Sequence, residues 1–318
     1  MPAPVYKYGN PPHSDACAPA RAALAGNPSD GYGGRTLALA LPSLEARLAV
    51  EPASGLELGP VRLAGVSELD RALEHGREPA LMAAALRRLA RVAEIPDSGF
   101  ALRYSSSVPG EVGLAGSSAL VVAALRAMCV AFDVRLSADE LALAALEAET
   151  EELGIAAGPQ DRVVQAHGGL VMMDFTASHW RVESLDPALL PPLFVAWRHE
   201  HATHSGDYHA ELRRRHDHGD GEVRRSLTKL ADLARDARDA LLAGDHEGFA
   251  RCVDGSFDER AAMGPLVPEH VEMIELARSL GASANYAGSG GAIVGTNPSD
   301  ELRTALERAG CTVLMPSE

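Results

Sequence analysis

The sequence predicts an α+β protein of two lobes. The chain has 318 residues, which at roughly 150 residues per domain is the length of about two domains. Strand-like and helix-like segments occur in both halves, and Pro187, Pro191 and Pro192 mark the best boundary between them. We therefore expect a leader at residues 1–16, an N-terminal lobe at residues 17–186 and a C-terminal lobe at residues 187–318.

The first half predicts strands around turn-rich segments and helices where apolar residues recur at helical spacing. The leader is rich in proline and has no period, so we expect it to be extended. Helical spacing ends before Pro96, and Ser137 with Glu140 predicts a capping box. The expected elements are, in order, two strands within residues 20–41 flanking a turn cluster at 26–34, a strand at 44–50, a helix at 79–92, a strand at 100–105, a buried helix at 119–132, a helix from the capping box to about 152, a short helix containing 161 and 165 that ends at 168–169, and a strand at 170–175.

The second half is mostly helical in its middle and returns to strands at its end. The expected elements are a strand at 193–197, helices over 207–280 with breaks near 219, 244 and 264, and a strand, helix and strand at 292–294, 299–308 and 312–314.

Charge and hydropathy exclude several classes of protein. Lys plus Arg is 29 against 44 for Asp plus Glu, and the net charge of −15 disfavours a nucleic-acid partner. The longest apolar run, Leu120 to Phe132, is interrupted by Arg126 and is shorter than the roughly 20 residues that span a bilayer. The N-terminus has no apolar stretch of signal-peptide length, so we expect a cytoplasmic protein without a membrane partner. The four cysteines form no CxxC pair, and the oligomeric state is not predicted.

A loop rich in Gly and Ser, Pro109 to Ser118, joins a predicted strand to the long buried helix. Glycines let the backbone approach a ligand closely, and the amino end of a helix offers N–H groups and a positive dipole that suit a phosphate. Ser117 and Ser118 can contact phosphate and Mg²⁺ there. The alternative is an ordinary turn with a serine cap. Neither GxxxxGK[ST] nor GxGxxG occurs, so this is not a Walker loop or a dinucleotide-binding turn.

Two carboxylates, Glu149 and Asp161, follow this loop. A phosphoryl-transfer enzyme needs one carboxylate to hold Mg²⁺ and often a second to orient or deprotonate the acceptor hydroxyl. The alternatives are that Glu149 belongs to an exposed acidic face over residues 147–152, and that Asp161 and Arg162 form a surface ion pair.

Two further segments have glycines beside short polar side chains: the loop of residues 27–34, with Arg21 on the strand before it, and the turn of residues 288–291. They can leave room for a hydroxyl-rich ligand, or they can be tight turns.

In combination, these motifs resemble the GHMP kinase superfamily. The phrase Gly113-Leu114-x-x-Ser117-Ser118, with Pro109 before it and Glu149, Asp161 and the late glycine turn after it, fits the order and spacing of the three superfamily motifs. Within the superfamily the chain is most similar to the glucuronokinase group. The similar segments are residues 21–36, 113–119, 153–165, 168–175, 189–193, 213–215 and 288–292, and the resemblance covers about residues 21–295.

This resemblance implies an N-terminal ATP-binding lobe related to ribosomal S5 domain 2 and a ferredoxin-like C-terminal lobe that completes the substrate site. It implies an ATP-dependent, Mg²⁺-assisted kinase that phosphorylates the anomeric hydroxyl of a monosaccharide, first of all D-glucuronate, to give glucuronate 1-phosphate. The open alternatives are a kinase for a neutral hexose, a kinase for a non-sugar alcohol, and a catalytically silent regulatory relative that binds sugar or ATP.

The resemblance also implies roles for individual residues. Asp161 would be the base or orienter for the acceptor hydroxyl, and Arg21 would keep that aspartate ionised and steady the transferred phosphoryl group. Ser118 and Glu149 would be the ligands of Mg²⁺. The residues expected at the ATP phosphates are Pro109, Gly113, Leu114, Ala115, Gly116, Ser117 and Ser118. The residues expected at the sugar are Asn27, Ser29, Asp30, Gly33, Arg35, Arg162, Gly288, Ser289 and Gly290.

One position departs from the glucuronokinase pattern. Asp207 follows Ser205-Gly206, where the pattern has a lysine. An anion does not suit the carboxylate of a uronic acid, so the positive charge would have to come from Arg35, Arg162 or Arg213. We interpret the nearby histidines as a solvated polar loop that could serve as a substrate lid rather than as a metal site; they are His199, His201, His204 and His209.

Overall fold

The computed structural model describes residues 13–198 and 205–316, with the backbone alone at residues 205–209. The chain forms two compact units. Among the described residues, unit 1 comprises 13–20, 44–108 and 115–166, and unit 2 comprises 21–43, 109–114, 167–198 and 205–316. The division therefore differs from the predicted boundary after residue 186. The leader expected at residues 1–16 overlaps the first strand, which begins at Ser14.

Seven strands form a mixed sheet with the order β4-β3-β5-β2-β6-β7, in which β1 pairs with β2. In unit 1, β2 is antiparallel to β5 and β3 is parallel to β5; in unit 2, β6 is antiparallel to both β2 and β7. The strands are β1 (Ser14–Ala25), β2 (Arg35–Pro52), β3 (Leu56–Leu58), β4 (Val61–Leu63), β5 (Phe100–Ser106), β6 (Leu170–Asp174) and β7 (Arg181–Leu185).

Strand β2 corrects the prediction of a separate strand at residues 44–50. It is continuous from Arg35 to Pro52, with Pro42 in its interior. Residues 35–39 pair with β6 and residues 46–52 pair with β5, so Pro42 lies between these two ladders. Its missing N–H interrupts neither of them.

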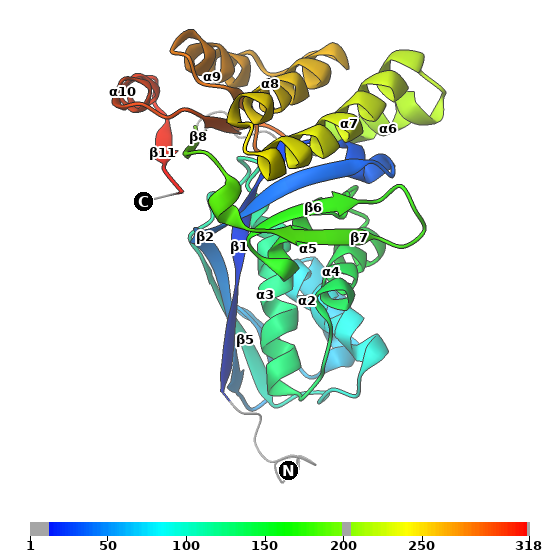
Figure 1. Ribbon diagram of the computed structural model, residues 1–318. Coiled ribbons are helices and arrows are strands. Elements are labelled where there is room, and N and C mark those ends of the chain that lie inside the picture. Colours follow the sequence, from blue (N-terminus) through cyan, green and yellow to red (C-terminus); the bar gives the residue numbers. More distant parts are fainter. Residues whose placement is uncertain (1–12, 199–204, 317–318) are drawn as a thin grey trace. The chain divides into compact units, whose positions relative to one another are not determined.

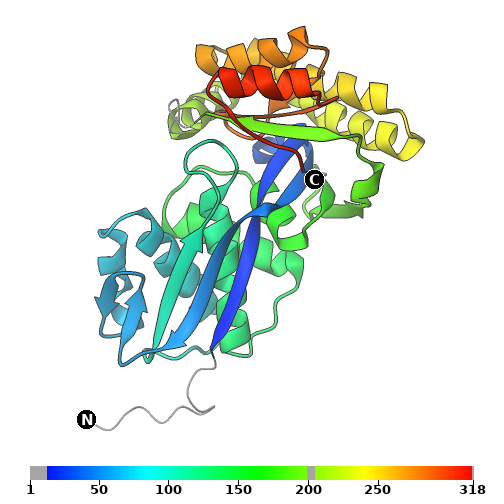
Figure 2. The ribbon, with the colours of Figure 1, turned by 90° about the vertical axis from the view of Figure 1, so that its left-hand side faces the viewer.

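Helices of unit 1 cover one face of the sheet formed by β1, β2 and β5 (Figures 1 and 2). Helix α3 is buried over most of its surface because residues 119–125 are all Ala, Leu or Val, which confirms the predicted buried helix. The helices are α1 (Leu69–Leu73), α2 (Arg77–Val92), α3 (Gly116–Ala131), α4 (Ala138–Glu147), a π-helical turn (Ala148–Glu152) and α5 (Gln160–His167).

Unit 2 contains a four-stranded antiparallel sheet with the order β11-β8-β10-β9. The strands are β8 (Leu193–Trp197), β9 (Ala284–Tyr286), β10 (Ala292–Thr296) and β11 (Thr312–Leu314), and the helices are α6 (Ser205–Asp217), α7 (Gly221–Ala243), α8 (His246–Ala262), α9 (Pro268–Ser279) and α10 (Asp300–Arg308). A strand, helices, two strands, a helix and a strand follow one another, which is the predicted ferredoxin-like pattern.

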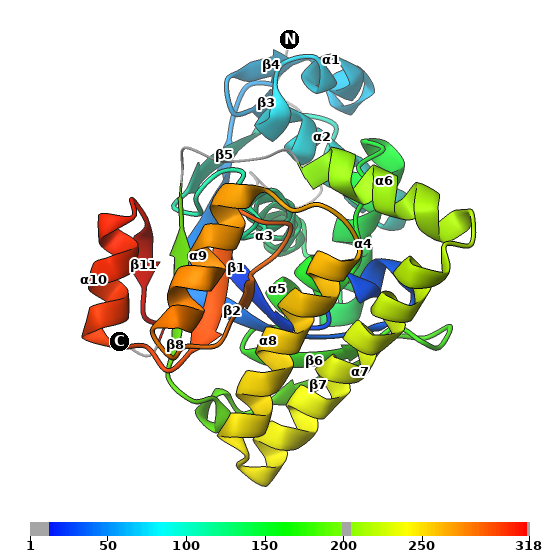
Figure 3. The same cartoon turned by 90° about the horizontal axis from the view of Figure 1, so that it is seen from above.

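The core of this sheet is built from one face of β8, β9 and β10 and from α8, α9 and α10. Phe194, Phe257, Ile274, Tyr286 and Leu302 belong to one buried cluster. Helices α7 and α8 lie side by side (Figure 3). No helix in the described part of the chain is both long and apolar enough to cross a bilayer.

Most predicted elements are confirmed within a few residues, but the short strands β3, β4, β7 and β9 were not predicted.

The capping box of α4 is present as predicted. Ser137 Oγ accepts a hydrogen bond from Glu140 N at 3.2 Å, and the Glu140 carboxylate accepts one from Ser137 N at 2.7 Å. We expect Ser137→Ala to lower the free energy of unfolding by about 1 kcal/mol, measured by urea unfolding with circular dichroism, because orphan N–H groups at the helix start lose their acceptor.

Ser279→Ala is the matched control for the cap. Ser279 is the last residue of α9; its exposed Oγ donates to Leu276 O and, at the carboxyl end of a helix, caps no N–H group. This variant should change the free energy of unfolding by less than about 0.5 kcal/mol. Equal losses in the two variants would contradict a capping role for Ser137.

Candidate functional site

The predicted site residues fall into two groups, one in each unit. Unit 1 contains the start of α3 at Ala115 to Ser118, with Glu149, Asp161 and Arg162. Unit 2 contains Arg21, the loop of residues 26–35, the segment Pro109–Leu114 and the turn of residues 287–291.

The N-cap of α3 is Ala115, which has left-handed backbone angles, φ 64° and ψ 39°. No side chain caps this helix, so the alternative of an ordinary serine cap is wrong. Ser118 Oγ lies 3.4 Å from Ala115 O, and Gln165 Nε2 donates to the same oxygen at 2.9 Å. The first-turn amides of a helix without a side-chain cap can serve an anionic ligand.

The loop that leads to this helix has positive φ at three alternate positions. The angles are 59° at Glu111, 79° at Gly113 and 64° at Ala115. A positive φ costs a non-glycine residue roughly 1–3 kcal/mol, and such residues gather at ligand sites. The backbone conformation of this loop therefore lowers local stability.

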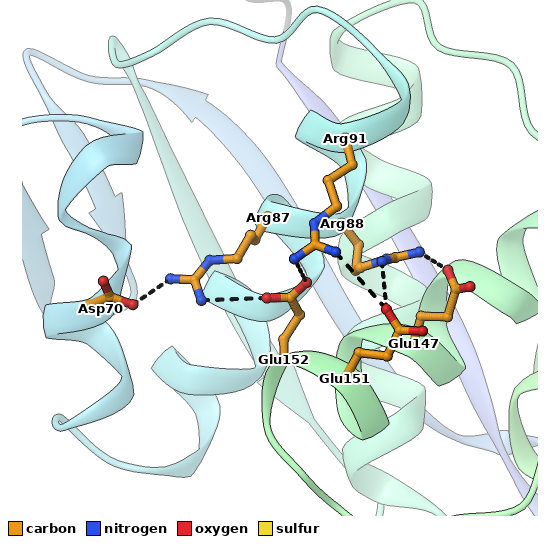
Figure 4. Close-up of polar contacts among 7 residues, drawn as sticks. All are labelled: Asp70, Arg87, Arg88, Arg91, Glu147, Glu151 and Glu152. Carbon is orange, nitrogen blue, oxygen red and sulfur yellow. Dashed lines mark hydrogen bonds and ion pairs between the residues drawn. The ribbon is translucent and has the colours of Figure 1, made fainter.

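The glutamates within residues 147–152 have two different sets of partners. Glu147, Glu151 and Glu152 form ion pairs with arginines of α2 (Figure 4). Arg88 pairs with Glu147 and, at 3.0 Å, with Glu151; Arg87 lies 3.4 Å from Glu152 and 2.7 Å from Asp70; Arg91 lies 2.6 Å from Glu152. These pairs fix the π-helical turn against α2.

Glu149, in the same turn, is 2% exposed. Its Oε2 accepts hydrogen bonds from Arg162 Nε at 2.7 Å and from a terminal nitrogen of the same guanidinium at 2.5 Å. Burial raises the pKa of Glu149, although Arg162 acts in the opposite direction. The alternative that Glu149 belongs to an exposed acidic face is therefore wrong.

Asp161 lies in the first turn of α5, beside Arg162. Its Oδ2 is 3.8 Å from Arg162 Nη1, and its Oδ1 accepts a hydrogen bond from Gln160 Nε2 at 3.3 Å. Arg162 is 4% exposed, so the alternative of a surface ion pair is wrong as well. Arg162, expected at the sugar, contacts both Glu149, the carboxylate expected at Mg²⁺, and Asp161, the carboxylate expected at the acceptor hydroxyl.

In unit 2, Arg21 connects two of the predicted motifs. It is 4% exposed and donates through Nη1 to Gly113 O at 2.6 Å and to Ala287 O at 2.8 Å. A Cβ at Gly288 would lie 2.2 Å from Gly113 O, and a Cβ at Gly113 would lie 2.5 Å from Gly290 O. The two backbone segments approach so closely that only glycine fits at these positions.

Two residues of this group were not predicted, Arg260 of α8 and His270 of α9. Arg260 donates to Asn27 Oδ1 at 2.9 Å, to Gly288 O at 2.8 Å and to Ser289 O at 3.1 Å. His270 Nδ1 accepts a hydrogen bond from Gly291 N at 3.2 Å. For Arg260, a charge at helical spacing from Val253 and Phe257, on a buried face, is the one signal that the sequence offers.

The loop of residues 27–34, the predicted sugar loop, and Arg35 at its end have polar side chains that bind other groups of unit 2. Ser29 Oγ donates to Arg35 O at 2.8 Å, and Arg35 Nε pairs with Asp174 Oδ2 at 3.0 Å. Asp30 is 7% exposed, and Gly33 has a φ of 74°. The predicted histidine loop cannot be described in the same way, because residues 199–204 and the His209 side chain lie outside the described part of the structure.

Known proteins resemble this chain along most of its length. Residues 80–169 match the GHMP kinases N terminal domain. Two Arabidopsis thaliana proteins, glucuronokinase 1 and probable glucuronokinase 2, are 34% and 35% identical; the matches cover 92% of this chain and 87% and 86% of those proteins.

Solved structures show the fold. Methanococcus jannaschii mevalonate kinase has a TM-score of 0.75 at 16% identity, over 96% of this chain and 98% of that one. Lactococcus lactis galactokinase in complex with galactose has a TM-score of 0.78 at 16% identity, over 97% and 94%. The identity to the Arabidopsis relatives over nearly the whole chain, together with the shared fold, shows that this chain belongs to the GHMP kinase family, as its motifs predicted.

Proposed function

We propose that this protein is a sugar kinase that transfers the γ-phosphoryl group of ATP to the anomeric hydroxyl of D-glucuronate and forms glucuronate 1-phosphate. The observation that carries the proposal is the 34–35% identity to two glucuronokinases over 92% of the chain. The family consists of ATP-dependent phosphotransferases with an alcohol acceptor. The glucuronate specificity and the roles of the individual residues are our proposal.

The loop from Pro109 to Ser118 is proposed to bind the phosphates of ATP. Its glycines have no side chains that would keep a ligand away from the backbone. The loop ends at the amino terminus of α3, which has no side-chain cap. Backbone N–H groups and the helix dipole act together on an anion at such a place. Ala115, held through its carbonyl by Gln165, fixes the direction in which the first-turn amides point.

Ser118 and Glu149 are proposed to hold Mg²⁺. The donor set fits, because Mg²⁺ prefers oxygen ligands and takes only one or two carboxylates when phosphates and water supply the rest. When bound, the ion neutralises charge on the transferred phosphoryl group.

Asp161 is proposed to orient the acceptor hydroxyl and accept its proton. A sugar hydroxyl is a weak nucleophile, and the transferred phosphoryl group carries dispersed negative charge, so positioning and charge neutralisation supply most of the acceleration. Arg21 is proposed to supply positive charge to that group. The guanidinium of Arg162 contacts both Glu149 and Asp161 and holds their carboxylates in place.

The proposed reaction needs ATP and a sugar acid as its small-molecule partners. The cytoplasm is the compartment that we propose, since ATP is supplied there.

The substrate is tested by coupled ADP release with uronic acids, aldohexoses and deoxysugars. We expect Mg²⁺-dependent turnover with D-glucuronate and at least about 10-fold lower kcat/KM with galactose, because a charged contact to the sugar contributes roughly 1.5–3 kcal/mol. Turnover with galactose and not with glucuronate would contradict the substrate. Binding of ATP without turnover of any sugar would favour the regulatory alternative.

The role of Asp161 is tested with Asp161→Asn. We expect turnover to fall by roughly 10²- to 10⁴-fold, because the proton acceptor is lost. The dissociation constant of ATP, measured by calorimetric titration, should stay within about threefold of the wild-type value. Equal losses of turnover and of ATP affinity would contradict the role.

The metal site is tested with Glu149→Gln and, as its control, Glu151→Gln. Glu151 belongs to the same helical turn but is exposed and pairs with Arg88. We expect Glu149→Gln to raise the Mg²⁺ concentration needed for half-maximal nucleotide binding by at least about 10-fold. Glu151→Gln should change it by less than about twofold.

Removing the charge of Glu149 also leaves Arg162 without its buried carboxylate partner, which destabilises a fold by about 3–5 kcal/mol. Circular dichroism therefore has to show that the variant is folded. Glu149→Asp keeps the charge and should give an intermediate Mg²⁺ requirement. Identical behaviour of the Glu149 and Glu151 variants would contradict the assignment of the ligand.

A further inference from the structure

Three consecutive arginines of α6, Arg213, Arg214 and Arg215, have different partners. Arg214 forms a bidentate pair with Glu211, with distances of 2.8 and 2.7 Å. Arg215 contacts one oxygen of Asp220, Oδ2, through Nε at 2.8 Å and Nη2 at 2.7 Å. Arg213 makes no ion pair with a carboxylate of the described residues. Asp217 is exposed and interacts with it only at longer range.

Arg213 is instead held on the predicted sugar loop. One of its N–H groups donates to Gly31 O at 2.6 Å, and its guanidinium lies 4.2 Å from the centre of the Tyr32 ring. These two residues follow Asp30, which the family resemblance places at the sugar. A guanidinium has five N–H donors, so most of the donors of Arg213 do not take part in this contact.

The loop and the arginine are fixed to each other by packing within unit 2. Tyr32 packs against a buried cluster that includes Leu212, the neighbour of Arg213 in α6. The ring of His216, one helical turn further along, lies 4.7 Å from the Tyr32 ring. The position of Arg213 relative to Asp30 is therefore set before a ligand binds, which reduces the entropy that binding costs.

The other two arginines considered for a sugar carboxylate are already engaged. Arg35 pairs with Asp174, and Arg162 pairs with Glu149. In each of them a carboxylate of the chain already offsets the positive charge of the guanidinium. Arg213 is held instead by a carbonyl oxygen and an aromatic ring, which leave its charge to a ligand.

We propose that Arg213 binds the carboxylate of an acidic sugar and thereby determines the selectivity for a uronic acid over a neutral sugar. This inference rests on the proposed function. A guanidinium recognises a planar carboxylate with two parallel hydrogen bonds, and the aromatic ring beneath it limits its movement. Such a contact would supply the positive charge that Asp207 cannot supply.

The experiment compares glucuronate with glucuronamide, which has nearly the same shape and no charge. The quantity measured is the ratio of kcat/KM for the acid to kcat/KM for the amide. We expect Arg213→Gln to lower this ratio by about 10- to 100-fold, mainly through a higher KM for glucuronate. Arg213→Lys keeps the positive charge but cannot form two parallel hydrogen bonds, so it should lower the ratio less than Arg213→Gln does.

Arg214→Gln is the matched control, because it removes the same charge from the same helix but disrupts a pair with Glu211. Its ratio should stay within about twofold of the wild-type ratio. An unchanged ratio in Arg213→Gln, or equal losses in the two variants, would overturn the inference while wild-type turnover of glucuronate still supports the proposed function. Absence of turnover with glucuronate in the wild type would overturn both.

Discussion

The buried pair of Glu149 and Arg162 is the interaction on which the geometry of unit 1 depends. Transfer of a carboxylate and a guanidinium out of water costs several kcal/mol per ion, and an apolar pair of similar volume often stabilises a fold as well or better. Burial raises the pKa of Glu149 even with Arg162 against it, so the pair leaves part of the desolvation penalty uncompensated. Stability alone does not account for this arrangement.

The surroundings of Glu149 support a functional explanation. Three neighbouring glutamates are bound to arginines of α2, and these pairs hold the turn that carries Glu149. Arg162 lies against both Glu149 and Asp161 and holds the two in a fixed relation. A carboxylate held this way loses little entropy when a cation approaches it, and a cation relieves the penalty that burial imposes.

The sequence predicted local features of this protein better than long-range ones. The capping box of α4, the buried helix α3 and the glycine-marked breaks between the helices of unit 2 depend on neighbouring residues, and they are where we expected them. The contacts of Arg260 and Arg21 depend on residues 233 and 266 positions away, and no local pattern reports such a contact. The motifs did indicate Glu149, Asp161 and Arg162, but not that Arg162 contacts both carboxylates.

The selectivity for the acceptor has to come from side chains rather than from the fold. Mevalonate kinase and galactokinase, whose names specify different acceptors, share this fold with the chain at 16% identity. Phosphate binding by backbone amides is indifferent to the acceptor, because the amides contact only the nucleotide. Discrimination between an acid and a neutral sugar needs a charge at a fixed distance from the hydroxyl contacts. Within unit 2, Arg213 has both properties: among the described residues no carboxylate forms an ion pair with it, and Tyr32 holds it beside the loop that contains Asp30.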